Sequence, residues 1–202
     1  MASSKTEIVN IALSHLGVGS EIANLDTDQS TEANAMRRFY ESAKDEVLRD
    51  LNWPFTTVFA SLALVEEDPT DEWSYSYRYP SDALKIRRVL SGLRNDTRQS
   101  RVPYKVGQDS SGLLLYCDID DAEIEYTKRE DDTSLYPVDF TLALSYKLAF
   151  YTAPRLTKGD PFGLANRAMQ MYNVTIAKAA NNALNEEQVE ENPDSEFIRS
   201  RE

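Results

Sequence analysis

The feature that most constrains this chain is a long amphipathic helical pattern at residues 33–55 (ANAMRRFYESAKDEVLRDLNWPF) that ends abruptly. Its apolar positions recur every three or four residues, which places them on one helix face: Met36, Tyr40, Ala43, Val47 and Leu51. Charged side chains occupy much of the rest: Arg37, Arg38, Glu41, Lys44, Asp45, Glu46 and Arg49. Because Pro54 lacks a backbone N–H and biases Trp53 toward extended geometry, we expect the helix to end at or before Trp53. The pattern is typical of a packed helix and carries no catalytic motif.

Length and charge narrow the class of protein. The 202 residues suffice for one sizeable domain, or for one domain that carries an inserted subdomain. Hydrophobic residues make up 41% of the chain, so a core can form. The net charge of −12 argues against a wide basic face that grips nucleic acid. An acidic surface repels DNA phosphates, which suits the wall of a channel through which DNA slides.

Cysteine content and hydropathy add two further expectations. The chain has one cysteine, Cys117, so no disulfide framework forms within it. Cys117 follows the apolar run at 113–116, and we interpret it as a buried thiol rather than a reactive one. No stretch approaches the ~18 apolar residues of a membrane span, so we expect no membrane partner. The first residues, MASSKTEIVN, lack the apolar core of a signal peptide, which predicts intracellular synthesis.

Capping residues predict the two N-terminal helices. Ser4 with Glu7 three residues later fits a capping box, so a first helix should begin near Ser4. Gly17 stands where a left-handed C-cap is needed. After a turn-rich connection, Ser30 or Thr31 should cap the second helix.

Prolines mark the two C-terminal helices. Pro137 suits the first turn of a helix that is apolar almost all round and should therefore be central, and Pro154 should end it. Asp160 as cap and Pro161 at the first helical position should begin a long final helix. From residue 185 the chain becomes an acidic tail with too little apolar area to fold on itself.

Between the helices the hydrophobic period changes to that of strands. Trp73, Tyr75, Tyr77 and Tyr79 alternate with polar or charged residues, which is typical of a half-buried strand. Further runs rich in strand formers occupy residues 56–64, 83–90, 102–106, 113–117 and 122–127. Turn residues separate them at 66–71, 91–101 and 107–112. We therefore expect five or six short strands.

The order of helices, strands and helices predicts an α+β fold. We expect an antiparallel helical bundle of about four helices with an inserted small antiparallel β-subdomain and an extended C-terminal tail. Residues 1–55 and 132–185 would form the bundle, residues 56–131 the β-subdomain, and residues 186–202 the tail.

Few residue patterns indicate chemistry. The single histidine, His15, near the end of the first helix, has no cysteine or serine motif to work with, so we interpret it as structural. The acidic run at 118–125 misses the EF-hand spacing, since no glycine occupies loop position six, and we favour a solvated turn over a metal site. The chain has no GxxxxGK[ST], GxGxxG, GxSxG or CxxC motif. We predict no catalytic residue, no cofactor and no metal.

The aromatic run WSYSYRYP at 73–80 has two interpretations. It could stack nucleic-acid bases, but the acidic charge favours aromatics that pack a β-core or a protein interface. Six basic residues follow this run in the sequence: Lys85, Arg87, Arg88, Arg94, Arg98 and Arg101. They could bind an acidic partner, contact DNA locally, or only balance the charge of neighbouring acids.

Four segments in order carry a family resemblance. They are IVNIALSHLGVGSEI at 8–22, RRFYESAKDEVLRDLNWPF at 37–55, the W-x-Y-x-Y-x-x-P run at 73–80 and DSEFIRSR at 194–201. Together they resemble the phage head-to-tail connector adaptors, including the tail tubular protein A type of short-tailed phages. The likeness covers most of the chain in order and rough spacing, and residues 91–130 carry little of it.

The resemblance implies a structural role in the virion. Members of that family form a ring, usually of twelve subunits, beneath the portal, join it to tail or nozzle proteins, and let double-stranded DNA pass through the lumen. The helical bundle would make the ring, with interface candidates Arg37, Arg38, Glu41, Lys44, Asp45 and Arg49. A plain solvated face is the other interpretation of these six. The tail would bind the portal through Phe197, Ile198, Arg199 and Arg201. The protein would be made in the host cytoplasm and end at the head–tail junction.

Two alternatives come from other functional classes. A peptidoglycan or polysaccharide hydrolase acting in phage entry would need two carboxylates in a cleft, one with an abnormal pKa. A DNA-binding module would use the aromatic run and show salt-dependent DNA binding. We expect the structural protein, and not an enzyme.

Overall fold

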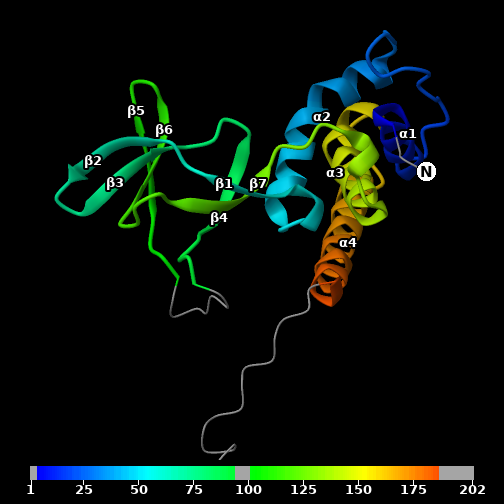
Figure 1. Ribbon diagram of the computed structural model, residues 1–202. Helices are drawn as coiled ribbons and strands as arrows, with labels where there is room; N and C mark the ends of the chain where they lie inside the picture. The colour runs from blue at the N-terminus through cyan, green and yellow to red at the C-terminus, as the bar shows by residue number, and fades with distance from the viewer. Residues whose placement is uncertain (1–3, 94–100, 187–202) are drawn as a thin grey trace, which may run out of the picture.

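The computed structural model describes residues 4–93 and 101–186, which form a helical lobe and a β-lobe (Figure 1). The helices are α1 (Lys5–His15), α2 (Thr31–Asp50), α3 (Val138–Leu156) and α4 (Leu164–Glu186). The strands are β1 (Thr57–Ser61), β2 (Leu64–Thr70), β3 (Trp73–Arg78), β4 (Ala83–Val89), β5 (Lys105–Asp109), β6 (Gly112–Cys117) and β7 (Glu123–Lys128). Two short 3-10 helices, Pro54–Thr56 and Thr133–Leu135, lie on the connections between the lobes.

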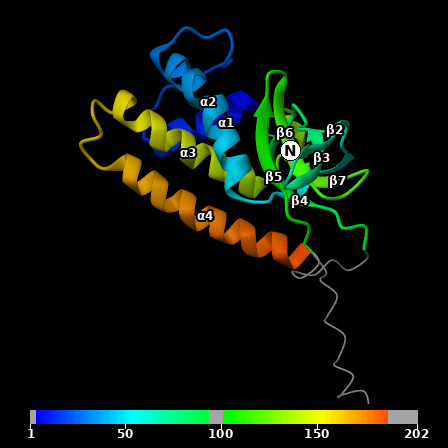
Figure 2. The ribbon, with the colours of Figure 1, turned by 90° about the vertical axis from the view of Figure 1, so that its left-hand side faces the viewer.

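Helix α3 is the centre of the helical lobe. It packs against α1, α2 and α4, and Figure 2 shows α4 lying along it at the outer edge of the lobe. Phe140, Leu144 and Leu148 of α3 are fully buried. This arrangement confirms the prediction of a central helix, because a helix with neighbours on several sides needs apolar residues on several sides.

Helix α2 begins and ends as its sequence predicts. The N–H of Ala33 donates to the Ser30 side chain at 3.2 Å, which confirms Ser30 as the N-cap. The helix ends at Asp50, before Trp53. The buried Trp53 indole donates to the carbonyl of Val47 at 2.8 Å, and its ring meets Phe140 edge-on at 5.2 Å. Trp53 therefore fixes the end of α2 onto the core around α3.

The first helix and the loop after it are tied together by side chains. The N–H of Glu7 donates to the Ser4 hydroxyl at 3.1 Å, and Gly17 has φ +69, so both predicted caps are confirmed. The Asn10 side-chain amide then pairs with the backbone N–H and carbonyl of Ile22, each at 3.0 Å. This pair holds the loop back against α1.

The β-lobe contains two antiparallel sheets among the described residues. One has the strand order β1-β7-β4 and the other β2-β3-β6-β5. Tyr77, Leu115 and Ile124 are fully buried or nearly so, in a core between the sheets that is separate from that of the helices. Because cross-strand neighbours share a face, the pairing of Tyr77 with Leu115 places both in this core.

Arg87 of β4 joins the lobes. Its guanidinium donates to the carbonyl of Trp53 at 2.9 Å and to the hydroxyls of Thr57 at 2.6 Å and Thr127 at 2.9 Å. A side chain that bonds the end of the α2 segment and two β-strands fixes the orientation of the β-lobe against α2.

The prediction of a helical bundle with a small inserted β-subdomain is wrong. The described part of the chain is α+β, with four helices and two antiparallel sheets of three and four strands. The acidic stretch that includes Glu66 and Pro69 was expected to be a turn, but it forms edge strand β2. An edge strand tolerates proline and exposed acids because one of its sides has no backbone partner to lose.

Two helix ends also differ from the prediction. Pro154 lies inside α3, which continues to Leu156: the proline removes one backbone donor, and the helix still closes after it, where the N–H of Thr157 donates to the carbonyl of Ala153 at 2.9 Å. Helix α4 begins at Leu164, not Pro161. Asp160 still caps it: the N–H groups of Leu164 and Ala165 donate to its carboxylate at 2.6 and 2.9 Å.

Candidate functional site

The six interface candidates on α2 lie in different environments. Arg37 donates to the carbonyls of Leu25 and Asp28 and so holds the preceding loop. Asp45 pairs with Arg129. Arg38 and Arg49 are exposed. Their role between subunits stays a prediction.

Lys44, another of the six, is fully buried within an ion-pair cluster. Its ammonium donates to Glu41 at 2.6 Å and to Asp131, which lies on the return from the β-lobe. Burial lowers the pKa of Lys44, but the bonds to Asp131 and Glu41 outweigh it, and the net pKa is raised. The same bond lowers the pKa of Asp131. Lys44 and Glu41 thus contact each other within one chain, and their role between subunits stays a prediction.

A second buried lysine joins three helices. Lys147 of α3 lies 3.3 Å from Glu46 and 3.9 Å from Asp50, both on α2. The hydroxyls of Tyr151 and Tyr172 donate to the same two carboxylates, each at 2.5 Å. The Lys147 ammonium also lies 4.7 Å from the centre of the Tyr172 ring. Because Tyr172 belongs to α4, this cluster ties α4 to α2 across α3.

The pKa values of the two tyrosines in this cluster suit a structural role. The bond to Glu46, together with burial, raises the pKa of Tyr151 to about 12. Burial and the bond to Asp50 raise the pKa of Tyr172 further. Both phenols therefore stay protonated and donate their hydrogen bonds at neutral pH. In the sequence this site shows only as one lysine in the apolar middle of α3 and as two acids, Glu46 and Asp50, four residues apart on α2, and these signals did not lead to its prediction.

Shifted carboxyl groups among the described residues all move in one direction. The pKa values of Asp28, Asp109, Asp131 and Asp132 are lowered, in each case chiefly by hydrogen bonds to the carboxylate. A glycosidase general acid needs a raised pKa. These four carboxyls are thus unsuited to the hydrolase alternative.

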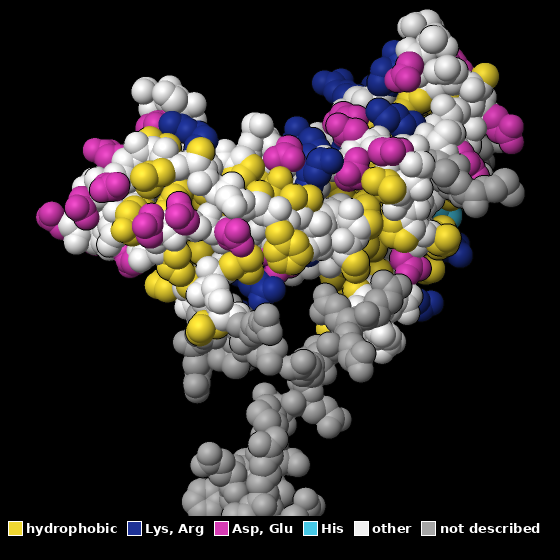
Figure 3. All heavy atoms as spheres, viewed as in Figure 1, with side chains coloured by type: hydrophobic (Ala, Val, Ile, Leu, Met, Phe, Trp, Pro, Cys, Tyr) yellow, Lys and Arg dark blue, Asp and Glu magenta, His cyan; other side chains and the backbone are white. Residues whose placement is uncertain are grey.

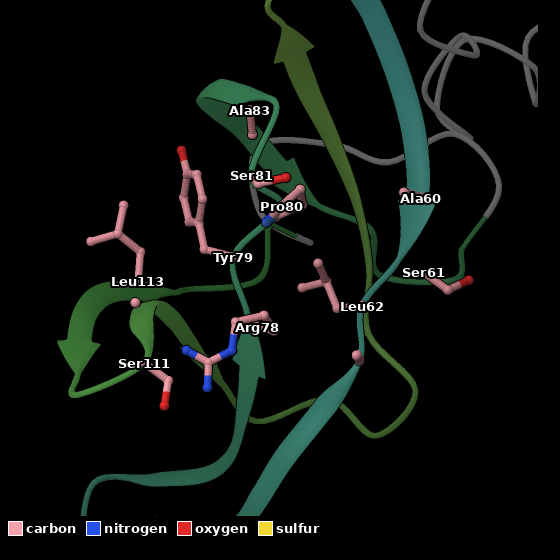
Figure 4. Close-up of a pocket in the computed structure, with 12 residues that line it drawn as sticks. Ala60, Ser61, Leu62, Arg78, Tyr79, Pro80, Ser81, Ala83, Ser111 and Leu113 are labelled. Atoms are coloured by element: carbon pink, nitrogen blue, oxygen red, sulfur yellow. The ribbon is translucent and has the colours of Figure 1, made fainter.

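Two of the grooves in the described surface lie beside the C-terminal end of α2 and in the β-lobe. One, of about 350 Å³, lies between the C-terminal ends of α2 and α4, where Lys85 donates to the carbonyl of Arg49 at 3.2 Å. The larger, of about 610 Å³, lies in the β-lobe where β1 meets β2 and β3 meets β4 (Figure 4). Tyr79 and Leu113 line it, and its one charged side chain, Arg78, is paired with Asp109. Neither groove gathers a nucleophile and a base.

His15 and Cys117 have the structural settings that were predicted. The His15 ring stacks on Tyr146 at 4.1 Å, and its Nε2 lies 3.2 Å from the Ser145 hydroxyl. Since that hydroxyl donates to the carbonyl of Leu142, His15 donates to it as the Nε2–H tautomer. Burial lowers the pKa of His15 and raises that of the fully buried Cys117.

The aromatic run packs the β-lobe rather than a nucleic-acid surface. Tyr77 is buried in the core between the sheets, and the partly buried Tyr75 and Tyr79 pack against it. The acidic run divides between a turn and β7, and its Glu125 pairs with Arg88 at 2.6 Å. Among the described residues no three His, Cys, Asp or Glu side chains gather closely enough to hold a metal ion. No described helix combines the length and apolar character needed to cross a membrane.

Several predicted residues fall outside the described part of the chain. They are the basic residues Arg94 and Arg98 and the portal-binding candidates Phe197, Ile198, Arg199 and Arg201. The division into domains stays a prediction. The helices and strands fall within the expected ranges, except that α4 extends to Glu186, one residue beyond the expected end of the bundle at 185.

Comparisons with known proteins add no assignment: no family model and no curated protein sequence matches this chain.

Proposed function

We propose that this chain is a virion structural protein, a head–tail connector adaptor that forms a ring beneath the portal, joins it to the tail, and lets DNA pass. The observation that carries the proposal is the ordered resemblance of residues 8–22, 37–55, 73–80 and 194–201 to that family. The acidic charge supports it, since a lumen wall of acidic subunits repels DNA.

Exposed apolar side chains on both lobes support an assembly role. Phe162 and Val138 on the helical lobe and Phe59 on the β-lobe are 83%, 73% and 60% exposed. Each would contribute apolar contact area if a partner covered it. The buried lysine clusters support the same role, because they make the helical lobe a rigid body that can hold a fixed place in a ring.

Electron microscopy tests the proposal. The purified chain is mixed with the portal protein encoded in the same genome, and the expected result is an added ring of density on the portal. Deleting residues 186–202 should leave a folded protein that no longer binds the portal. A portal that gains no density from the full chain, or that binds the truncated chain equally well, would contradict the proposal or its assignment of the tail.

A further inference from the structure

Helix α4 has an outward face with little charge. Between residues 164 and 185 the sequence has two charged side chains, Arg167 and Lys178, and no acid. They lie about 16 Å apart on nearly the same side, since eleven residues make close to three helical turns. Between them on that side, Met171 and Val174 are 40% and 46% exposed. We call these four residues the α4 stripe.

A surface of opposite character lies on the β-lobe. The strand β2 is an edge strand, and Leu64 and Val65 at its start are 47% and 43% exposed. The segment 64–72 has five acids and no cation. Acidic side chains gather at this outer end of the β-lobe (Figure 3). We call Leu64, Val65, Glu66 and Glu67 the acidic edge.

The two surfaces match in composition. Each has exposed apolar side chains beside charges of a single sign, cationic on the α4 stripe and anionic on the acidic edge. Apolar contact with flanking opposite charges is the arrangement that gives a protein interface both affinity and register.

Their positions prevent the two surfaces from meeting within one chain. The acidic edge lies at the far end of the β-lobe and α4 at the outer edge of the helical lobe (Figures 1 and 2). A contact between different surfaces of identical chains is heterologous, and when the rotation closes it generates a ring. We propose that the α4 stripe of one copy binds the acidic edge of the next copy, and this inference rests on the ring proposed above.

Cysteine cross-linking tests the pairing directly. The chain carrying both Val65→Cys and Val174→Cys is treated with a short bismaleimide, in a background whose single native cysteine, Cys117, is buried. We expect a ladder of dimers, trimers and higher species, because each copy offers both halves of the contact. A control chain with Val65→Cys and Leu135→Cys places the second thiol at an exposed site outside the α4 stripe and should give no ladder.

Charge reversal tests the chemistry of the contact. In the Val65→Cys, Val174→Cys chain, either Arg167→Glu with Lys178→Glu or Glu66→Lys with Glu67→Lys should lower the cross-link yield by about tenfold at low salt. Combining all four reversals should restore the yield, which loss of folding in either variant cannot do.

The outcomes separate this inference from the ring itself. Absence of a ladder at protein concentrations up to about 1 mM, where contacts of millimolar Kd are populated, would overturn the pairing. A ladder in the control chain would overturn it as well. Cross-linking of Val174→Cys to Phe197→Cys within one chain would assign the stripe to the C-terminal segment and overturn it. If the portal gains a ring but no cross-linked ladder forms, the adaptor proposal stands and the pairing fails. If a ladder forms but the portal gains no ring, the pairing stands and the adaptor proposal fails.

Discussion

The helical lobe and the β-lobe hold their elements together in different ways. Among the described residues the helical core contains 24 buried apolar residues, whereas the core between the two sheets contains 8. The β-lobe instead relies on backbone pairing between adjacent strands. The helical lobe should therefore be sensitive to single buried side chains, and the β-lobe to register and to its junction with α2.

Both lobes have a buried ion pair, since Arg87 and Glu125 of the β-lobe lie 3.5 Å apart with side chains 8% and 15% exposed, but other pairs of the two lobes differ in exposure. Lys44 and Lys147 of the helical lobe are 0% and 4% exposed. In the β-lobe, Arg78 and Asp109 form a two-pronged pair at 2.9 Å that remains open to water. Buried ion pairs fix side-chain geometry but cost desolvation free energy, whereas ion pairs open to water fix geometry less and cost less desolvation.

The largest effect is expected in the helical core. Phe140 is fully buried and packs against Trp53, Phe55 and Tyr136. Replacing it with alanine should lower the free energy of unfolding by about 3–5 kcal/mol, through lost apolar contact and the cavity that remains. Urea unfolding followed by circular dichroism measures this change.

The control for this prediction is Phe59→Ala in the β-lobe. Phe59 is 60% exposed, so its removal should change the free energy of unfolding by less than about 0.5 kcal/mol. Equal costs for the two variants would show that the core around α3 does not dominate stability.

The sequence predicted elements well where a local signal was strong. Capping by Ser30 predicted where α2 begins, and the proline after Trp53 predicted where it ends. The apolar character of α3 on all sides predicted its central position. Strand β3 was equally clear from its alternating aromatics. These features depend on residues that are close together in the sequence, so the sequence alone is enough to predict them.

The parts that failed depend on neighbours in space. Strand β2 looked like a turn because its acids and Pro69 are acceptable only at a sheet edge. The cluster around Lys147 of α3 draws Glu46 and Asp50 from α2 and Tyr172 from α4, and the sequence does not show that residues so far apart in the chain meet. The pattern predicts a surface position for Lys44, because a charged residue beside an apolar stripe ordinarily faces water.

A smaller effect should distinguish the charge of Lys147 from its carbon chain. Glu46 and Asp50 are 43% and 42% exposed, so water can compensate them when the ammonium is lost. Lys147→Met, which keeps the stem, should change the free energy of unfolding by less than about 1 kcal/mol. Lys147→Ala also leaves a cavity under Tyr172 and should cost about 1–2 kcal/mol more.

Thermal unfolding of the two Lys147 variants at neutral pH measures the difference. Hydrogen exchange at the amides of α4 shows whether this helix loosens first, as expected if the cluster ties it to α2. If Lys147→Met proves the more damaging of the two, the charge rather than the stem holds the three helices together.

The smallest effect belongs to the open ion pair of the β-lobe. The bond from Arg78, with a backbone N–H from Ser111, lowers the pKa of Asp109 to about 2. Because the pKa in the folded state lies below the ordinary value of about 3.9, the pair stabilises the fold above about pH 4. This contribution is lost as the pH falls toward 2. NMR titration of the Asp109 carboxyl should therefore show a midpoint near 2.

Arg78→Gln should move the Asp109 midpoint upward, while the Ser111 N–H keeps it below the ordinary value. The matched control is Arg88→Gln, whose partner is Glu125, and it should leave the Asp109 midpoint unchanged. An equal rise in both variants would mean that the general field of the basic strands, and not the two-pronged bond, sets this pKa. In that case the open pair of the β-lobe would contribute no fixed geometry, and the contrast with the buried lysines of the helical lobe would be sharper than the distances alone indicate.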